Sequence, residues 1–492
     1  MYCGYVVKVD KLRPHGNADR LQIATFFGND TCVGLDIVPG EIGIYFPTDG
    51  QLSVQYCEAN NLVRKKDENG NNIGGYLDPD KRNVTAVRLR GERSDGLYMP
   101  LSSLVFTGAN LDDINIGDTI DIVNGVEICC KYIPRGNKRR SGGQTDGNRT
   151  RKKKVPVAPL FAEHADTEQL AYNLSAFKTG DEIEISLKMH GTSQRTGYLP
   201  VLKGYKQDFW GRLLRCINAD KKMKPFVAKL YDQAIRNATP IYDWGYVTGT
   251  RRTVLDNYDG GYYGNNEFRE IHSKAFEGKL HKGETAYYEV VGFTTNGTPI
   301  MSSSDNAKVN DKEFIKQYGQ TTTFSYGCSP TGEKTKYGKD EDGIYSITEY
   351  NKYSDMYVYR MTLTTEEGHI VEYTPDYMRY RCEQMGIKCV PVFEKFIIPE
   401  VISVETENGD IVFDSKPVDA GQYVLNRANL YYDGPDPVGK THVREGVVVR
   451  IVNKPKFAAY KHKNFSFKVL EGLAKAVAEA PDMEEADGLT EE

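Results

Sequence analysis

The chain has 492 residues but only 2 tryptophans and 9 cysteines, and no two cysteines form a Cys-x-x-Cys pair. The cysteine spacing therefore predicts no zinc knuckle, and we expect reduced thiols in a cytosol-like compartment. No apolar run approaches the roughly 18 residues that a membrane-spanning helix needs, so we expect no membrane partner. The first residues lack a basic stretch followed by an apolar stretch. This start predicts an intracellular, cytoplasmic protein.

An excess of positive charge is also missing. The 63 Lys and Arg residues are outnumbered by 68 Asp and Glu residues, which gives a formal net charge of −5. This balance excludes a chain that coats nucleic acid along its whole length, but it is compatible with a local basic patch. The chain does have 39% hydrophobic residues, with 33 Tyr and 19 Phe. That composition is sufficient for a buried core, and the length predicts two or three domains.

Residues 1–134 are predicted to form an N-terminal β-barrel domain. Short β-branched or aromatic runs alternate with Gly, Asn and Asp turns, which is the pattern of a small barrel with additional elements. The turn at 14–21, Pro-His-Gly-Asn-Ala-Asp-Arg-Leu, resembles a string that recurs in OB-type RNA-binding barrels. The same residues also fit a plain turn held by Asn and Asp side chains. The resemblance implies an OB-containing domain that binds RNA.

A basic, flexible linker is predicted at 135–156, with nine basic residues and one acidic residue. Its charge suits RNA phosphates, whereas a solvated spacer and a bipartite nuclear signal over 139–154 are the alternatives. An acidic C-terminal tail is predicted at 473–492. No segment indicates an obligate protein partner. The candidate RNA-binding residues of the linker are Arg139, Arg140, Arg151, Lys152 and Lys153.

Residues 157–472 are predicted to form a mixed α/β domain. Helices are expected at 223–238 and 375–386, between strands such as Glu-Ile-Glu-Ile-Ser-Leu-Lys-Met. The segment 434–441 has the letters of a phosphate-binding loop. Two prolines in it remove backbone donors, and a strand rather than a helix is predicted after it. We therefore exclude a phosphate loop there.

Five segments of this domain carry polar, charged or aromatic residues in or beside predicted strands. Each segment alone is weak evidence, because such short strings recur by chance. In this order they resemble the motif series of covalent nucleotidyltransferases, the superfamily of polynucleotide ligases and mRNA capping enzymes. The candidate residues are Lys188, His190, Gly191, Arg251, Glu289, Tyr357, Tyr359, Glu445, Lys461, Lys463 and Phe467.

Two motif variants narrow the resemblance. The His-Gly-Thr string at 190–192 and the Lys-x-Lys-Asn-x-x-Phe string at 461–467 resemble those of ATP-dependent RNA ligases. The N-terminal domain, the Lys-Tyr-Ile-Pro-Arg string at 131–135 and the segment 299–319 resemble the clade with an N-terminal OB domain. The resemblance implies an α+β fold. The OB-type barrel would be followed by an ATP-grasp-like nucleotidyltransferase domain of antiparallel sheets flanked by helices.

The resemblance implies that Lys188 attacks the α-phosphorus of ATP and becomes the AMP-lysine. ATP and a divalent metal, Mg²⁺ or Mn²⁺, are then the cofactors. A lysine with the usual pKa of about 10.4 is almost fully protonated near neutral pH, and nearby cations lower that pKa. Lys461 and Lys463 are two residues apart on a predicted strand and share one face, so they would supply such charge and hold phosphates.

The remaining candidates are expected to bind the metal and the nucleotide. Glu445 and Glu289 are the expected metal ligands, and Glu289 also suits the ribose. One of Tyr357 and Tyr359 is expected to stack on adenine, although either one alone is equally compatible with the core. Gly191 permits close backbone approach. The resemblance also assigns His190, Arg251 and Phe467 to the nucleotide site.

Two positions depart from the family pattern. His190 stands where many members have Asp, and a histidine does not organise metal-bound water as an anion. Arg252 stands where the clade often has Asn, so the phosphate contact is open between Arg251 and Arg252.

The predicted function is therefore an ATP-dependent RNA ligase. It would seal RNA 3′-OH and 5′-phosphate ends through lysyl–AMP and RNA-adenylate intermediates, and we expect a nicked duplex in RNA repair as the substrate. One alternative is a capping guanylyltransferase, although few residues follow Lys463 and capping enzymes carry an OB domain there. The alternative of another class is a non-catalytic RNA-binding protein.

Overall fold

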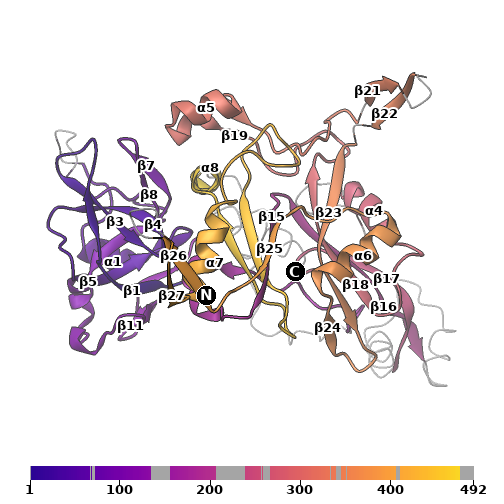
Figure 1. Ribbon diagram of the computed structural model, residues 1–492, viewed down its shortest axis with the longest axis horizontal. Helices are drawn as coiled ribbons and strands as arrows, with labels where there is room; N and C mark the ends of the chain where they lie inside the picture. The colour runs from indigo at the N-terminus through magenta and orange to yellow at the C-terminus, as the bar shows by residue number, and fades with distance from the viewer. Residues whose placement is uncertain are drawn as a thin grey trace, which may run out of the picture.

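The computed structural model describes residues 2–66, 68, 73–133, 156–206, 239–255, 258, 266–332, 334–339, 345–350, 352–405 and 411–476. It combines short antiparallel strands with a smaller number of helices (Figure 1). The predicted mixture of α and β structure is thus confirmed. The predicted linker up to residue 155, the helix at 223–238 and the tail beyond residue 476 lie outside the described residues. No helix in the described ranges has the length and hydrophobicity to cross a membrane.

The N-terminal region, residues 2–133, consists mainly of short strands. Its largest sheet has four antiparallel strands in the order β10-β1-β5-β9, and a three-stranded sheet follows the order β2-β3-β4. The predicted turn at 14–21 joins β2 to β3. The elements are β1 (Gly4–Lys8), β2 (Leu12–Pro14), β3 (Leu21–Phe26), β4 (Asn29–Gly34), β5 (Ile42–Phe46), β6 (Gly50–Leu52), α1 (Val54–Ala59), β7 (Val87–Leu89), β8 (Glu92–Ser94), β9 (Leu97–Pro100), η1 (Leu101–Thr107), η2 (Leu111–Asp113), β10 (Thr119–Ile120), β11 (Ile122–Val123), β12 (Val126–Glu127) and β13 (Cys129–Lys131).

A closed barrel is not found among the described residues of this region. The strands divide into separate sheets, with β6 paired to β13, β7 to β8 and β11 to β12. Asp121 separates β10 from β11, and these two strands belong to different sheets. The described strands therefore form no continuous ladder of the kind that a closed barrel has. The β-rich prediction is confirmed, and the OB-type barrel is not.

The second region, residues 156–476, contains two five-stranded sheets, in the orders β14-β29-β28-β15-β25 and β17-β16-β18-β23-β24. The elements are β14 (Glu168–Gln169), η4 (Leu170–Tyr172), η5 (Leu174–Ala176), β15 (Glu182–Lys188), β16 (Thr192–Lys206), β17 (Thr239–Gly249), α4 (Glu267–Lys274), β18 (Glu284–Gly292), β19 (Ser304–Asp305), η6 (Asn306–Val309), α5 (Lys312–Tyr318), β20 (Thr321–Thr322), β21 (Lys334–Lys339), β22 (Tyr345–Tyr350), β23 (Ser354–Thr364), β24 (Ile370–Glu372), α6 (Pro375–Met385), β25 (Val392–Ile397), β26 (Val401–Glu405), β27 (Ile411–Pro417), α7 (Ala420–Asn429), β28 (Gly446–Ile451), β29 (Ala459–Lys463) and α8 (Phe465–Ala476).

Local sequence explains helix α6, which was predicted at 375–386. The Thr374 side chain accepts a hydrogen bond from the Tyr377 N–H, Pro375 occupies the first turn, and Gly386 ends the helix in the left-handed conformation. Met378, Cys382 and the other apolar residues on one face are buried against the second sheet's core. The helix therefore follows from its capping residues and its apolar spacing.

The first sheet has two chemically different faces. Ile183 and Ile185 of β15 pack in one apolar cluster with Val447 and Val449 of β28 and with residues of α7. Because side chains alternate along a strand, the residues between these point to the other face. That second face carries the charged candidates of the site.

Helix α8 lies beside the N-terminal region (Figure 1). Phe465 and Val469 of α8 share an apolar cluster with Ala86, and Lys468 Nζ lies 2.6 Å from Asp95 Oδ2. The segment 434–441 leads into strand β28 rather than into a helix, which agrees with the exclusion of a phosphate loop.

Candidate active site

Strand pairing brings three distant motifs together. In the first sheet, Lys188 at the end of β15 is opposite Gly446 of β28, and Gly446 is opposite Lys463 of β29. Glu445 directly precedes Gly446. The sheet therefore places residues from three separated motifs in one row, although more than 250 residues of sequence lie between the first and the second.

These residues form a buried cluster of charges. Lys188 Nζ lies 2.7 Å from Glu445 Oε1, and Lys463 Nζ lies 3.4 Å from the same oxygen. Lys463 Nζ also lies 2.7 Å from Glu471 Oε2 on α8. The Glu445 side chain is only 1% exposed and that of Lys463 5%. Side chains with so little exposure to water stay charged only when they are paired, so the fold itself maintains this cluster.

His190 lies against this cluster but is not charged at neutral pH. Its Nδ1 is 3.7 Å from Glu445 Oε2, and its ring packs edge-on against Phe324 and Phe467. Burial lowers the pKa of His190 to about 4, and the opposing attraction of Glu445 does not compensate. His190 is thus a neutral imidazole that packs between two aromatic rings.

A cavity of about 90 Å³ lies between the two five-stranded sheets. It collects four of the predicted site residues, namely Lys188 from the first sheet, Glu289 and Tyr359 from the second, and Arg251 from the end of β17. Its lining consists of His164, Thr167, Glu184, Ser186, Leu187, Lys188, Met189, Ser193, Arg251, Glu289, Tyr359, Met378, Val390, Val448, Arg450, Phe457 and Ala459.

The sequence did not decide which of Tyr357 and Tyr359 would stack on adenine, and the structure places the two side chains differently. Tyr359 lines the cavity, and its hydroxyl lies 3.0 Å from Ser193 Oγ. Tyr357 is absent from the lining and is 6% exposed within the apolar core of the second sheet. Tyr359 is therefore the tyrosine available to a base in this cavity, and Tyr357 is a core residue.

Arg251 and Arg252 also differ in position and in exposure. Arg251 lines the cavity and is 23% exposed, whereas the Arg252 side chain is 61% exposed and lies outside the lining. Asp166 holds both, because its two carboxylate oxygens each lie 3.3 Å from one guanidinium. The backbone N–H of His164 donates to the Arg251 carbonyl. The segment before β14 thus orients Arg251 toward the cavity.

Three further candidates lie outside the cavity lining. A Cβ atom on Gly191 would come within 2.4 Å of the Val290 carbonyl oxygen, so this position accepts only glycine. Phe467 is 1% exposed and packs in the core beside His190. Lys461 is opposite Val448, a cavity residue, and it therefore shares the cavity face of the sheet.

The structure adds residues that sequence reasoning missed. Asp166 and Glu471 contact predicted site residues, as described above. Arg450 lines the cavity, stacks on the Phe457 ring and donates to the Tyr373 carbonyl. Of these residues, only Arg450 could have been inferred from the sequence, because alternation along the strand places it on the same face as Val448, two residues before it. Asp166 and Glu471 come close to the predicted site residues only in the tertiary fold.

The donor chemistry fits a divalent cation that a nucleotide helps to bind. Within the described ranges, no group of three or more His, Cys, Asp or Glu side chains is placed to hold a metal ion. Mg²⁺ and similar ions often use only one or two carboxylates and take further oxygens from substrate phosphates. Glu445, with Glu289 in the adjacent cavity, provides carboxylates of this kind.

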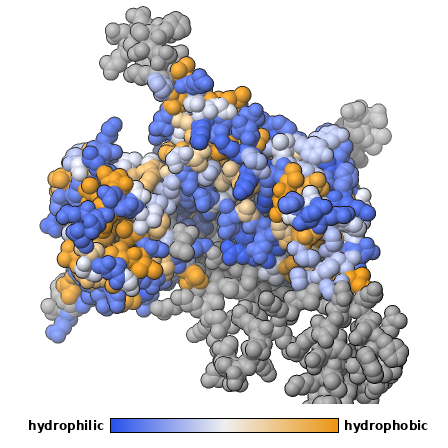
Figure 2. Space-filling view, turned by 90° about the horizontal axis from the view of Figure 1, so that it is seen from below, coloured by the Kyte–Doolittle hydropathy of each residue, from blue (hydrophilic) through white to orange (hydrophobic). Residues whose placement is uncertain are grey.

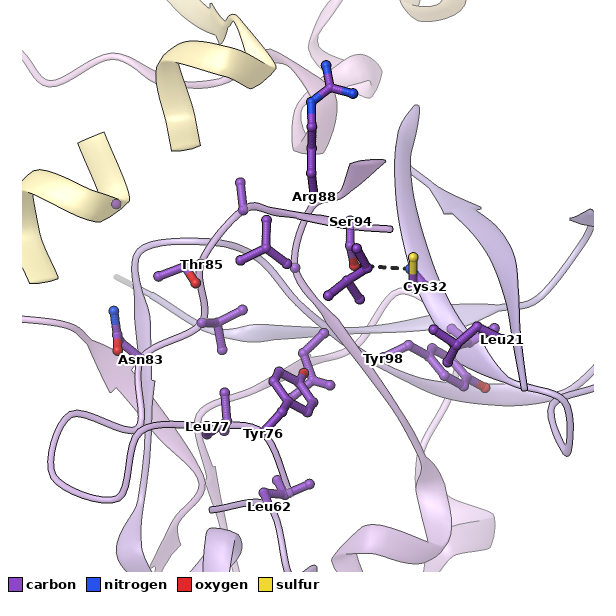
Figure 3. Close-up of a pocket in the computed structure, with 18 of the residues that line it drawn as sticks. Leu21, Cys32, Leu62, Tyr76, Leu77, Asn83, Thr85, Arg88, Ser94 and Tyr98 are labelled. Carbon is purple, nitrogen blue, oxygen red and sulfur yellow. Dashed lines mark hydrogen bonds between the residues drawn. The ribbon is translucent and has the colours of Figure 1, made fainter. Parts of the chain in front are cut away.

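A larger cavity, of about 940 Å³, has a different composition (Figure 3). It lies in the N-terminal region and extends to Val469 and Gly472 of α8. Arg88 at its edge is paired with Asp311, 2.6 Å away. Figure 2 shows hydrophobic residues gathered on the N-terminal region, at the left. The lining holds no buried lysine beside a carboxylate, so we place the chemistry in the smaller cavity.

The predicted RNA-binding residues Arg139, Arg140, Arg151, Lys152 and Lys153 lie outside the described residues.

No protein-family model matches the chain, and no curated protein matches it. Among solved structures, the chain is similar to a Naegleria gruberi RNA ligase with AMP and Mn, at 14% identity over 94% of this chain and 97% of that chain, with a TM-score of 0.48. A form of that ligase with ATP and Mn has 13% identity over 94% and 98%, with a TM-score of 0.45. A form with PPi has 14% identity over 94% and 97%, with a TM-score of 0.46.

Proposed function

We propose that this chain is an ATP-dependent RNA ligase that acts through a lysyl–AMP intermediate. The observation that carries the proposal is the position of Lys188. Its amine is paired with a buried carboxylate, has a second lysine at the same oxygen, and borders a cavity that also holds Arg251 and Tyr359. An amine nucleophile, phosphate-binding cations and an aromatic face for a base are the groups that nucleotidyl transfer needs.

The first step follows from these positions. The Lys188 amine loses a proton, leaves Glu445 and attacks the α-phosphorus of ATP; a nitrogen–phosphorus bond forms as the bond to pyrophosphate breaks. Arg251 binds phosphate oxygens through its planar fork, and Lys461 and Lys463 add positive charge on the same sheet face. A divalent cation on Glu445 and Glu289, when bound, supplies further neutralisation of phosphate charge. Tyr359 stacks on adenine.

The later steps concern RNA. AMP passes from Lys188 to an RNA 5′-phosphate, and an RNA 3′-OH then displaces AMP to seal the ends, those of a nicked duplex in our proposal. The N-terminal region, as an OB-type domain, and the basic linker, through Arg139, Arg140 and their neighbours, are the proposed RNA-binding parts. The positive charge of the linker supports this assignment, because phosphate contacts dominate non-specific affinity for nucleic acids.

The decisive experiment is label transfer from α-labelled ATP in the presence of Mg²⁺ or Mn²⁺, followed by denaturing gel analysis. We expect label on the wild-type chain from ATP but not from GTP. Lys188→Ala should abolish it and yet retain sealing of a pre-adenylated RNA. Lys178→Ala, which changes an exposed lysine, is the matched control and should label normally. Label from GTP would indicate a capping guanylyltransferase. The absence of label from either nucleotide would indicate a non-catalytic RNA-binding protein.

A further inference from the structure

Four charged residues form an alternating row at the site. The row runs from Lys188 through Glu445 and Lys463 to Glu471, with distances of 2.7, 3.4 and 2.7 Å between successive charged atoms. Two ammonium groups and two carboxylates give it a formal charge of zero. Both lysines approach the same oxygen of Glu445, so this carboxylate is shared.

The shared carboxylate creates a competition. A cation that binds Glu445 Oε1 competes with two ammonium groups, because Lys188 and Lys463 both lie beside this oxygen. Lys188 has an alternative role as the nucleophile. Lys463 is 5% exposed and cannot move into water, so it needs another anion within reach. Glu471 is that anion, and at 2.7 Å it lies closer to Lys463 than Glu445 does.

We infer that Glu471 is a positioning residue that holds Lys463 off Glu445 and so leaves Glu445 able to bind the divalent cation. This inference rests on the function proposed above, and it assigns a role to a helix residue that belongs to none of the motifs. Glu471 acts through Lys463, which it holds, and is placed neither on the nucleotide nor on the cation.

Helix α8 is built to hold Glu471 in this place. Asn464 precedes the helix; its side chain accepts from the Phe467 N–H, and its backbone N–H donates to the Glu445 carbonyl. The start of the helix is thus tied to the residue before β28. Phe467 and Glu471 are four residues apart and share a helix face, so the turn that buries Phe467 in the core also directs Glu471 toward Lys463.

Residues next to Glu471 on α8 are also held in place. Lys468 is held by Asp95, 2.6 Å away, and by Asn29, while Val469 is buried in the cluster with Ala86. The Glu471 carboxylate therefore has little freedom to follow Lys463. Removal of its charge would leave the attraction of Glu445 for Lys463 unopposed by Glu471 and would give the remaining three groups of the row a net positive charge, which disfavours a dication.

The test is a metal-binding measurement that does not depend on turnover. Mn²⁺ is titrated into wild-type protein and into Glu471→Gln in the presence of α,β-methylene-ATP, which cannot transfer AMP, and free Mn²⁺ is read by electron paramagnetic resonance. We expect Glu471→Gln to weaken Mn²⁺ binding by roughly tenfold or more, the size typical of changes beside a metal ligand. Glu383→Gln, on the exposed side of α6, is the matched control and should bind as wild type does.

A second measurement separates positioning from folding. The Mn²⁺ concentration for half-maximal self-adenylation should rise in Glu471→Gln, while the rate at saturating Mn²⁺ recovers toward that of wild type. Glu471→Asp should restore part of the affinity, because it keeps the charge. A variant with unchanged Mn²⁺ affinity, or one whose rate falls equally at every Mn²⁺ concentration, overturns the inference. A wild-type chain that takes no label from ATP overturns the proposed function instead.

Discussion

The N-terminal region and the second region both contain many antiparallel strands, but the Arg13 ion pairs of the first and the Arg381 ion pair of the second differ in burial. Arg13 pairs with Asp30 and Glu92 in the first region, and these side chains are 27–47% exposed. In the second region, Arg381 and Glu284 pair at 2.8 Å with 4% and 0% exposure. The row at Lys188 is also largely buried.

The comparison shows that the larger cavity is not the one with buried charged groups beside it. The larger of the two cavities described above lies in the N-terminal region, whereas Lys188 borders the smaller one. Buried pairs contribute little net stability, since desolvation offsets their attraction. Such pairs beside a cavity therefore indicate function more strongly than cavity volume does. Three predictions test the contrast between buried and exposed charged or titratable groups.

The largest effect is expected on stability. Arg381→Ala leaves the Glu284 charge buried without its main partner, so we expect a loss of about 3–5 kcal/mol in the free energy of unfolding. Arg13→Ala removes an exposed pair and should cost less than about 1 kcal/mol. Urea unfolding followed by far-UV circular dichroism measures both, because both regions contain β-strands that contribute to this signal. Equal losses of unfolding free energy in Arg381→Ala and Arg13→Ala would contradict the expected difference between buried and exposed ion pairs.

The second effect is a dependence on pH. Burial lowers the pKa of His272 to about 4, and its Nε2 lies 2.8 Å from Ser354 Oγ. In the unfolded chain this pKa is about 6.5, so the unfolded state binds more protons between the two values. The stabilising contribution is therefore complete above about pH 6.5 and is lost as pH falls toward 4.

The expected loss is up to roughly 3 kcal/mol for this histidine. His272→Gln should flatten the pH dependence of unfolding in this window, while His369→Gln, which changes an exposed histidine, should leave it unchanged. The measurement is a series of urea titrations from pH 7.5 to pH 4. If His272→Gln follows the wild-type curve, the histidine does not carry the effect.

The smallest effect concerns the two adjacent arginines. Arg251→Lys keeps the charge but loses the fork that binds phosphate, so we expect self-adenylation to fall by about 10–100-fold. Arg252→Lys, at the neighbouring exposed position, should change it by less than about twofold. The comparison uses single-turnover label transfer at saturating ATP and metal. Equal losses would show that orientation by Asp166 does not distinguish the two side chains.

Much of the second region was predictable from local sequence. The strand predicted from Glu-Ile-Glu-Ile-Ser-Leu-Lys-Met is β15, and the helix predicted at 375–386 is α6. These signals are local, because a strand face or a helix cap is encoded within a few residues. The N-terminal barrel was predicted with the same reasoning, but whether strands close into a barrel depends on their pairing, which single segments do not specify.

The sequence by itself determined which residue types the site has and the order in which the strands carry them. The tertiary structure decided which members of each pair border the cavity: Tyr359 rather than Tyr357, and Arg251 rather than Arg252. It also decided the role of Glu471, which reaches Lys463 only because α8 folds back beside β29. The physical reason is that proximity between side chains depends on strand register and helix packing across hundreds of residues, and these are set by the whole core rather than by any local pattern.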